Sequence, residues 1–102
     1  MSKEMTTLEL AARARFDGEE VWGGKWINGS QLKCAVVSLT PCENDTVSNA
    51  QLANLMGASI STANRALFAL LKNGTLTAMP SKKTNAMRYL VNRKKLKTLV
   101  HK

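Results

Sequence analysis

Apolar residues recur every three or four positions along most of the chain, a spacing that places them on one face of a helix. The first such run follows Thr6, which has the capping-box spacing with Glu9. It predicts a helix that ends at Asp17 and Gly18. Its buried face is expected to consist of Leu8, Ala11, Ala12 and Phe16.

Residues 17–30 are rich in glycine and break this pattern. Trp22 and Trp26 are four positions apart, which puts both indoles on one side of either a helix or a strand. Gly23 and Gly24 between them oppose both regular elements. We therefore expect an irregular segment or a short strand whose indoles pack on the domain or on a partner subunit.

The helical pattern resumes after Ser30, a candidate N-cap, and stops at Thr40, because the residue before Pro41 avoids the helical conformation. A polar loop is expected over 41–46. The predicted buried face of this helix is Leu32, Ala35, Val36 and Leu39.

Two further helices are predicted on either side of Gly57. The first begins at Ser48, with Gln51 at the capping-box position, and ends at Gly57, which tolerates the left-handed conformation. The second begins at Ser59 and runs to about Asn73. The expected buried residues are Leu52, Leu55 and Met56 in the first helix, and Ala63, Ala66, Leu67, Leu70 and Leu71 in the second. The other face of the second helix carries Ser61, Arg65, Phe68 and Lys72.

From residue 75 the apolar pattern changes from helical to alternating, which predicts a strand over 75–80 and a returning strand over 87–91. A polar, basic turn joins them, and Met79 and Met87 leave the register open. Asn92 is expected to cap a last basic helix with Leu96, Leu99 and Val100 on its inner side. The predicted fold class is therefore mainly α with a small β-hairpin.

The charge of the chain is distributed unevenly. The net charge is +8, yet residues 1–71 hold six basic and seven acidic side chains, whereas residues 72–102 hold nine basic and no acidic ones. This asymmetry favours a polyanionic partner for the C-terminal third. The alternative is a solvated basic tail that only aids solubility. A length of 102 residues with 44% hydrophobic residues suits one globular core.

Several function classes find no support in the sequence. No apolar stretch is long enough to cross a membrane and no secretory leader is evident, so we expect a cytoplasmic protein. We see no nucleophile elbow, no phosphate-binding glycine loop and no paired carboxylates on a rigid face, and His101 lies at a chain end. Cys34 and Cys42 lack zinc-ligand spacing and are expected to be reduced, with a bridge between them left open. Cys34 is interpreted as a core residue. We expect no catalytic site, metal, cofactor or small-molecule ligand.

Two short helices joined through Gly57, Ala58 and Ser59 have the sequence signature of a helix-turn-helix motif. With the hairpin that follows, residues 46–91 resemble a winged helix-turn-helix domain of MarR-like and GntR-like bacterial regulators. The resemblance implies that the helix from Ser59 reads the major groove, and that the hairpin tip acts as a wing on the backbone or minor groove. It is carried by Val47, Leu52, Ala53, Leu55, Met56, Gly57, Ser59, Ser61, Thr62, Asn64, Arg65, Ala66, Leu67, Leu70, Asn73, Gly74, Thr75 and Leu76.

The same resemblance implies which residues bind DNA. Arg65 has the chemistry to pair with guanine and Asn64 with adenine, while hydroxyl groups reach bases or phosphates. The alternative for both residues is a solvated helix face. The predicted groove-facing residues are Ser61, Thr62, Asn64 and Arg65, with Ser59 as cap and possible contact and Lys72 on the same face. The predicted wing residues are Ser81, Lys82, Lys83, Thr84 and Asn85, with Arg88 behind them.

Phe68 is the apolar residue on the polar face. It either packs against the wing or the N-terminal segment, or contacts nucleic acid. Residues 64–68 also resemble the recognition helix of winged domains that bind left-handed DNA, although the chain lacks their wing tryptophan.

Three regions are predicted: 1–30, an N-terminal extension and possible dimerisation element; 31–91, the winged helix-turn-helix domain; and 92–102, a basic C-terminal helix or tail. Trp22, Trp26, Leu8 and Phe16 form either a dimer contact or intrachain packing. The expected function is a nucleoid-associated, sequence-specific binder of double-stranded DNA, a transcriptional repressor or autoregulator of a bacterium, plasmid or phage, acting as a homodimer. The alternatives are a DNA-binding accessory of plasmid or phage replication or partition, and a winged module for protein contacts.

Overall fold

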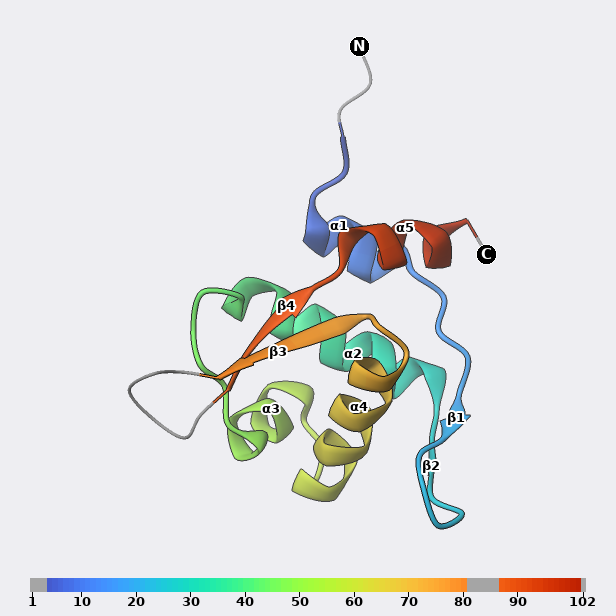
Figure 1. Cartoon of the computed structure of the whole chain (residues 1–102), viewed down its shortest axis with the longest axis vertical. Helices are drawn as coiled ribbons and strands as arrows, with labels where there is room; N and C mark the ends of the chain where they lie inside the picture. The colour runs from blue at the N-terminus through green and yellow to red at the C-terminus, as the bar shows by residue number, and fades with distance from the viewer. Residues whose placement is uncertain (1–3, 81–86, 102) are drawn as a thin grey trace.

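The computed structural model describes residues 4–80 and 87–101. Within these residues the chain is mainly helical, with two small antiparallel hairpins (Figure 1). The elements in chain order are α1 (Thr7–Arg13), β1 (Glu19–Glu20), β2 (Trp26–Ile27), α2 (Gly29–Leu39), the 3-10 helix η1 (Thr40–Cys42), α3 (Asn49–Met56), α4 (Ile60–Lys72), β3 (Leu76–Pro80), β4 (Met87–Val91) and α5 (Arg93–Val100). The expected class, mainly α with a small hairpin, is confirmed. None of the helices in the described part is both long and apolar enough to span a membrane.

Helix α1 begins as predicted and ends early. Thr6 and Glu9 form the capping box, but the chain becomes extended at Ala14 instead of continuing to Phe16. The backbone N–H of Arg15 donates to the carbonyl of Leu99, which ties the segment after α1 to α5. The buried side of the segment is Leu10, Ala11 and Ala14, so the prediction that Leu8 and Ala12 are buried is wrong.

Helix α2 is the centre of the core and begins earlier than expected. Its N-cap is Asn28, whose side chain accepts from the Gln31 N–H at 2.9 Å, and not Ser30. The first helical residue is Gly29. A glycine is needed at this position because any Cβ would collide with the carbonyl group of Phe16. The four residues predicted to form its buried face are all buried.

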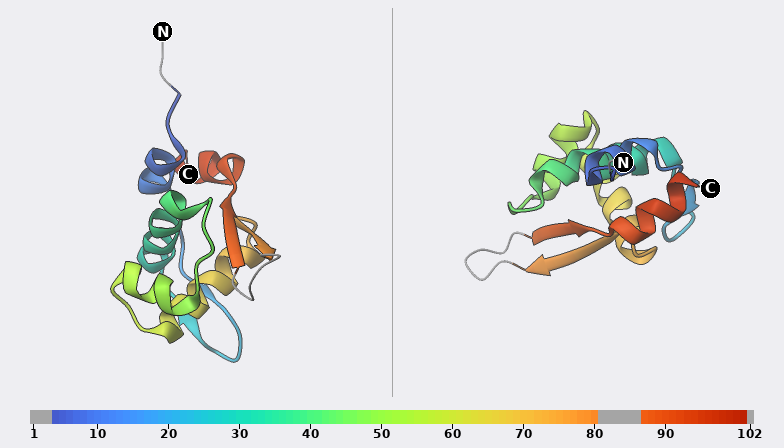
Figure 2. Two further views of the ribbon diagram at one scale, coloured as in Figure 1. Left: turned by 90° about the vertical axis from the view of Figure 1, so that its left-hand side faces the viewer. Right: turned by 90° about the horizontal axis from the view of Figure 1, so that it is seen from above.

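One continuous core joins all parts of the described chain. Leu10 from α1, Leu32 from α2, Leu70 from α4 and Leu96 from α5 belong to the same buried cluster. Helices α1 and α5 lie side by side at one end of the molecule (Figures 1 and 2). The described residues of all three predicted regions therefore contribute to a single packed core.

Glycine shapes the segment between α1 and α2 into a hairpin. β1 and β2 pair antiparallel, with Glu20 opposite Trp26, and the turn closes through Lys25 N–H to Trp22 C=O at 2.9 Å. Gly23 and Gly24 adopt φ of 55° and 76°, which only glycine adopts without strain. As expected, Gly23 and Gly24 lie outside the regular elements, in the turn between two short strands.

The second hairpin follows α4 directly. Gly74 adopts a φ of 82°, and β3 then pairs with β4 so that Leu76 lies opposite Val91 and Pro80 opposite Met87. Val47, in the segment before α3, forms an isolated bridge to Met87. The first residues of the expected polar loop 41–46 belong to η1. Burial of Tyr89 within this hairpin raises the pKa of its phenol above the ordinary value.

Candidate nucleic-acid interface

Helices α3 and α4 meet at a tight, locally determined turn. Gly57 ends α3 in the left-handed conformation, with φ 65° and ψ 35°, and its N–H donates to carbonyls of α3. Ser59 then caps α4, its hydroxyl accepting from the Thr62 N–H at 3.2 Å. Both signals were predicted, and together they fix the direction in which α4 leaves the turn.

The outer face of α4 is mixed in character. The side facing the core is Ala63, Ala66, Leu67, Ala69 and Leu70, which matches the predicted stripe except for Leu71, which is exposed. Leu55 on α3 was also predicted to be buried, yet its exposed fraction is 53%. The outer face of α4 consists of Ile60, Ser61, Phe68, Leu71 and Lys72.

Thr62 does not belong to that outer face. Its exposed fraction is 8%, and its hydroxyl lies 3.0 Å from the Ser59 hydroxyl and accepts from Arg65 Nη2 at 3.2 Å. The prediction that Thr62 faces a groove is wrong. Its position on the helix beside Ala66 and Ala69 was a usable sign that it points inward.

Arg65 is covered by the N-terminal hairpin. Its Nη1 donates to the Trp26 carbonyl at 3.3 Å, and its Nε is buried without a hydrogen-bond partner. Arg65 was predicted to face the major groove, whereas in the structure its guanidinium donates to the Trp26 carbonyl and to the Thr62 hydroxyl. Phe68 makes an edge-on contact with Trp22, with ring centroids 5.0 Å apart, so it packs against the N-terminal segment.

Asn64 lies on the other edge of α4. Its Oδ1 accepts a hydrogen bond from Asn49 Nδ2 of α3, and the residue is half-buried. This bond uses the amide oxygen of Asn64. Ser61, by contrast, is exposed one residue after the start of the helix.

The remaining predicted contacts lie around β3 and β4. Lys72 is exposed at the end of α4, and Arg88 is half-buried on β4 with Nη2 3.6 Å from Met79 Sδ. The other predicted wing residues, Ser81, Lys82, Lys83, Thr84 and Asn85, lie outside the described residues.

The basic helix α5 lies at the end of the molecule away from the start of α4 (Figure 1). Arg93 donates to the Thr7 hydroxyl and to the Met5 carbonyl, each at 2.8 Å, and forms an ion pair with Glu4. Leu96 is fully buried inside the chain, which confirms its predicted place on the inner side of this helix.

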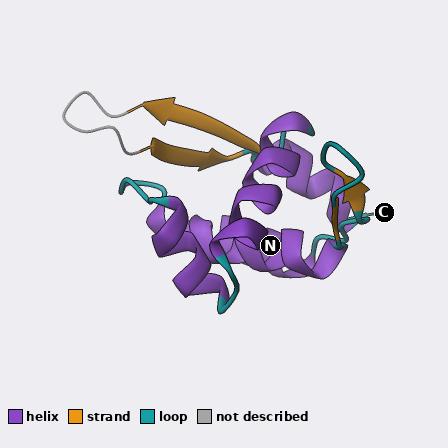
Figure 3. Cartoon of the chain, turned by 90° about the horizontal axis from the view of Figure 1, so that it is seen from below, coloured by secondary structure: helices purple, strands orange, loops and turns teal. Residues whose placement is uncertain are grey.

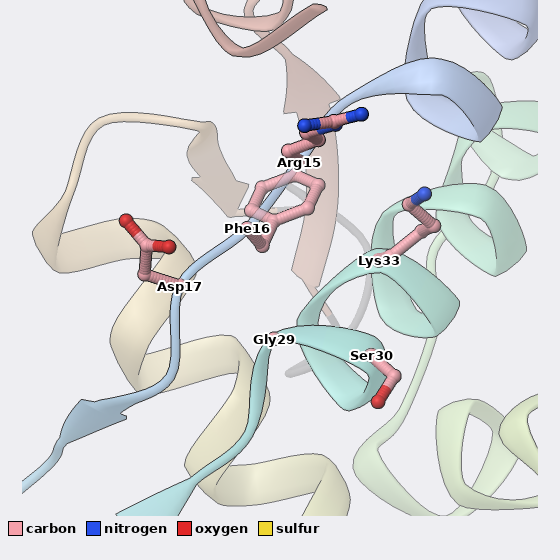
Figure 4. A pocket seen from close by; sticks show the side chains of 6 residues that line it. All are labelled: Arg15, Phe16, Asp17, Gly29, Ser30 and Lys33. Carbon is pink, nitrogen blue, oxygen red and sulfur yellow. The ribbon is translucent and has the colours of Figure 1, made fainter. Parts of the chain in front are cut away.

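Beside α2 the described chain has a shallow open pocket of about 400 Å³ (Figure 4). Its lining residues are Arg15, Phe16, Asp17, Gly29, Ser30 and Lys33. Arg15 and Lys33 lie on one side of it and Asp17 on the other. Cys34 and Cys42 are free thiols, and within 4–80 and 87–101 no three side chains of His, Cys, Asp or Glu group to hold a metal ion.

Among the surfaces described above, the one formed by α4 and the β3–β4 hairpin is the best-defined candidate site. Comparisons with protein-family models, with curated proteins and with solved structures found no match to this chain.

Proposed function

We propose that this chain is a winged helix-turn-helix protein that binds specific sequences of double-stranded DNA, as a transcriptional repressor or autoregulator working as a homodimer. One observation carries the proposal. A capped helix, α4, follows α3 through a glycine turn and is followed directly by the β3–β4 hairpin, to which Val47 adds an isolated bridge at Met87. This order supports the proposal because a winged helix-turn-helix domain has its recognition helix beside a wing.

The charge distribution supports a duplex as the partner. Of the described basic residues in the C-terminal third, Lys72 lies at the end of α4 and Arg88 on the wing strand, whereas those of α5 lie at the other end of the molecule. Contacts between such side chains and phosphates supply most of the sequence-independent affinity for DNA.

The first turn of α4 is the part that enters the major groove in this proposal. Its backbone N–H groups and the exposed Ser61 hydroxyl suit phosphate or base-edge contacts. Asn64 uses its oxygen on Asn49, which leaves its amide nitrogen to donate to a base acceptor. Two copies on a palindromic site multiply the limited affinity of one small module, and occupation of a promoter then blocks access to it.

The experiment begins with selection of bound duplexes from a random pool, followed by fluorescence anisotropy. Asn64→Ala is expected to weaken binding to the selected site by about 1–3 kcal/mol, with little effect on random DNA. Asn49→Ala is the matched control, because it removes the same side-chain bond while keeping the Asn64 amide. If both variants weaken binding equally, Asn64 acts through the α3–α4 contact and not through a base.

The phosphate contacts have their own test. Arg88→Ala is expected to weaken binding to all sequences alike and to reduce the salt slope by about 1. Lys94→Ala, an exposed lysine of α5 at the far end of the molecule, is the control and is expected to leave both unchanged. If the chain does not bind duplex DNA at 50 mM salt, the proposed DNA-binding function is wrong.

A protein-interaction module is the second candidate, and one observation favours it: the outer face of α4 exposes Ile60, Phe68 and Leu71. Exposed apolar side chains on one face of a helix are suited to contacts with another protein. The salt titration separates the two functions, since DNA binding through several phosphates falls by roughly 10³-fold between 50 and 200 mM salt. A role in replication or partition is distinguished from repression by where the selected site occurs, in repeats near an origin or over a promoter.

A further inference from the structure

The β1–β2 hairpin and the helix beside it present exposed aromatic rings. Trp22 and Trp26 on the hairpin have exposed fractions of 49% and 56%, and Phe68 on α4 has 43%. Trp22 packs edge-on against Phe68, with ring centroids 5.0 Å apart. The Trp26 carbonyl accepts a hydrogen bond from Arg65 of the same helix. We call Trp22, Trp26 and Phe68 the aromatic surface.

The fold holds the aromatic surface in a fixed position. Val21 and Ile27, which are the chain neighbours of the two tryptophans, are buried in the core. At the base of the hairpin a Cβ on Gly18 would lie 2.7 Å from the Trp26 ring, so this ring rests directly on the backbone. Aromatic side chains held in this way lose little conformational entropy when they are covered, which suits them to binding another protein.

The charge of the hairpin segment opposes DNA as the partner of this surface. Residues 17–25 contain three carboxylates, Asp17, Glu19 and Glu20, and one basic residue, Lys25. The rest of the chain is strongly basic, since the net charge of all 102 residues is +8. Phosphates are repelled by such a segment, so a protein surface is the partner that fits it.

We propose that the aromatic surface is the contact between two copies of this chain. A two-fold axis passes between the two hairpins, so that the rings of one copy pack against the same rings of the other. The inference rests on the proposed function, for which it supplies the interface of the homodimer.

The exposed charges at the hairpin tip suit a contact of the surface with itself. Glu20 is exposed, and its carboxylate accepts from the Gly24 N–H. Lys25 is also exposed, with Nζ 5.8 Å from the Trp22 ring centroid. Within the described residues neither of these two charges forms an ion pair. A two-fold axis brings Lys25 of each copy toward Glu20 of the other, so opposite charges meet across the contact.

The area of the aromatic surface suits the centre of a dimer interface. Burying an aromatic side chain covers about 150–250 Å², so three rings at about half exposure leave roughly 200–350 Å² on each copy. A stable interface covers about 800 Å² on each partner and is centred on a few aromatic anchors. The rings therefore supply about a third of the required area, and the polar groups of the hairpin surround them as the rim.

This contact also places the two copies of α4 for one duplex. The β3–β4 and β1–β2 hairpins lie on opposite sides of the helices, so a contact through β1–β2 leaves both wings on the outside (Figure 3). The layers in order are α4, hairpin, hairpin and α4, and three steps of about 10 Å separate the helices by roughly 30 Å. Successive major grooves on one face of DNA are about 34 Å apart, so both helices reach the same duplex.

The chain offers a direct probe, because its two tryptophans both lie in this hairpin. Sedimentation velocity over a range of protein concentrations measures self-association of the full chain without DNA. Acrylamide quenching of tryptophan fluorescence in the same samples measures access to the indoles. We expect dimers to form as the concentration rises, and quenching to fall over the same range.

A truncated ring tests the apolar part of the contact. Trp22→Ala removes an aromatic anchor and is expected to raise the dimer dissociation constant by about 30-fold. Leu55→Ala is the matched control, because Leu55 on α3 is similarly exposed, at 53%, but lies outside the aromatic surface. Circular dichroism checks that both variants fold.

Paired charge variants test the two-fold geometry without changing the apolar packing. Lys25→Glu and Glu20→Lys each place like charges across the axis, so each alone is expected to raise the dimer dissociation constant by about tenfold. An equal mixture of the two variants restores opposite charges and is expected to associate as tightly as the parent. Lys94→Glu, on α5 at the other end of the molecule, is the control and is expected to leave association unchanged.

The results distinguish this contact from the proposed function. If the chain stays monomeric yet binds its selected site, or if Trp22→Ala associates as the parent does, the contact is rejected and DNA binding stands. If the mixture of charge variants associates no more tightly than either alone, the two-fold contact is wrong. If dimers form through the aromatic surface but no duplex binds, the contact stands and the DNA-binding function is rejected. If a duplex with one half-site lowers indole quenching while one copy is bound, DNA covers the surface, which also overturns the contact.

Discussion

Gly57 is the residue whose backbone determines how α4 leaves α3. Its φ of 65° is left-handed, yet a Cβ there would meet nothing within 4 Å, so backbone conformation alone opposes a side chain. Gly57→Ala is expected to lower the free energy of unfolding by about 1 kcal/mol, and Gly57→Asn by less, because asparagine tolerates this conformation. Urea unfolding measures both. An alanine variant as stable as the parent would contradict this explanation.

Tyr89 gives the fold a dependence on alkaline pH. Burial raises the pKa of its phenol, so the unfolded chain loses this proton at a lower pH than the folded chain. Below about pH 10 both states keep the proton, and above it stability falls until the raised folded pKa is passed. Urea unfolding at pH 8 and pH 11 is expected to show a larger loss for the parent than for Tyr89→Phe. Equal losses would remove Tyr89 as the cause.

Capping residues were predictable, and the contacts of Arg65 were not. Thr6, Ser48, Ser59 and Asn92 each cap the helix that their local sequence predicts. A cap involves residues within one turn, so the pattern contains the whole interaction. Arg65 bonds to Trp26, which is 39 positions away, and nothing near either residue indicates this pair. The contact between Arg65 and the β1–β2 hairpin therefore became apparent only once the fold was known.

At the scale of the element, substitutions at the start of α4 are expected to change stability and DNA binding separately. Ser59→Ala removes the cap and is expected to cost about 1 kcal/mol of stability. Ser59→Asp keeps a side-chain acceptor and places a negative charge at the positive end of the helix, so its stability is expected to be near that of the parent. The same charge faces the phosphates in the proposed complex, so affinity for DNA is expected to fall. Thermal unfolding and anisotropy measure the two effects. A Ser59→Asp variant that binds DNA as the parent does would place the start of α4 away from the duplex.

Helices and strands differ in how far their own local sequence determines them. Helices α2, α3, α4 and α5 were predicted to within a few residues because each has apolar periodicity over several turns. Strands β1 and β2 are two residues each, too short for alternation to be seen. They pack on α4, where Arg65 donates to the Trp26 carbonyl and Phe68 contacts the Trp22 ring. Leu8 and Leu71 fit the helical pattern but are exposed, since the neighbouring elements do not cover them.

At the scale of the whole molecule, the two ends of the chain complete the core. The sequence suggested an extension before residue 31 and a tail after 91, because the recognisable motif lies between them. Instead α1 packs on α5, and Arg93 donates to the Thr7 hydroxyl at the start of α1 and to the Met5 carbonyl just before it. Such pairing of distant helices depends on the path of the chain between them, which periodicity does not reveal.

Because the core is shared, a destabilising substitution in α5 is expected to destabilise the β1–β2 hairpin at the other end of the molecule as well. Leu96→Ala is expected to cost about 2–5 kcal/mol, because Leu96 is fully buried in the shared core. Lys94→Ala on the exposed side of α5 is the matched control and is expected to have almost no effect. Tryptophan fluorescence reports the β1–β2 hairpin and far-UV circular dichroism reports the helices, so the two signals follow different regions during urea unfolding. If one core holds the chain together, both transitions of Leu96→Ala shift to lower urea by the same amount. A shifted helical transition with an unshifted tryptophan transition would show that α5 and the hairpin belong to separate units.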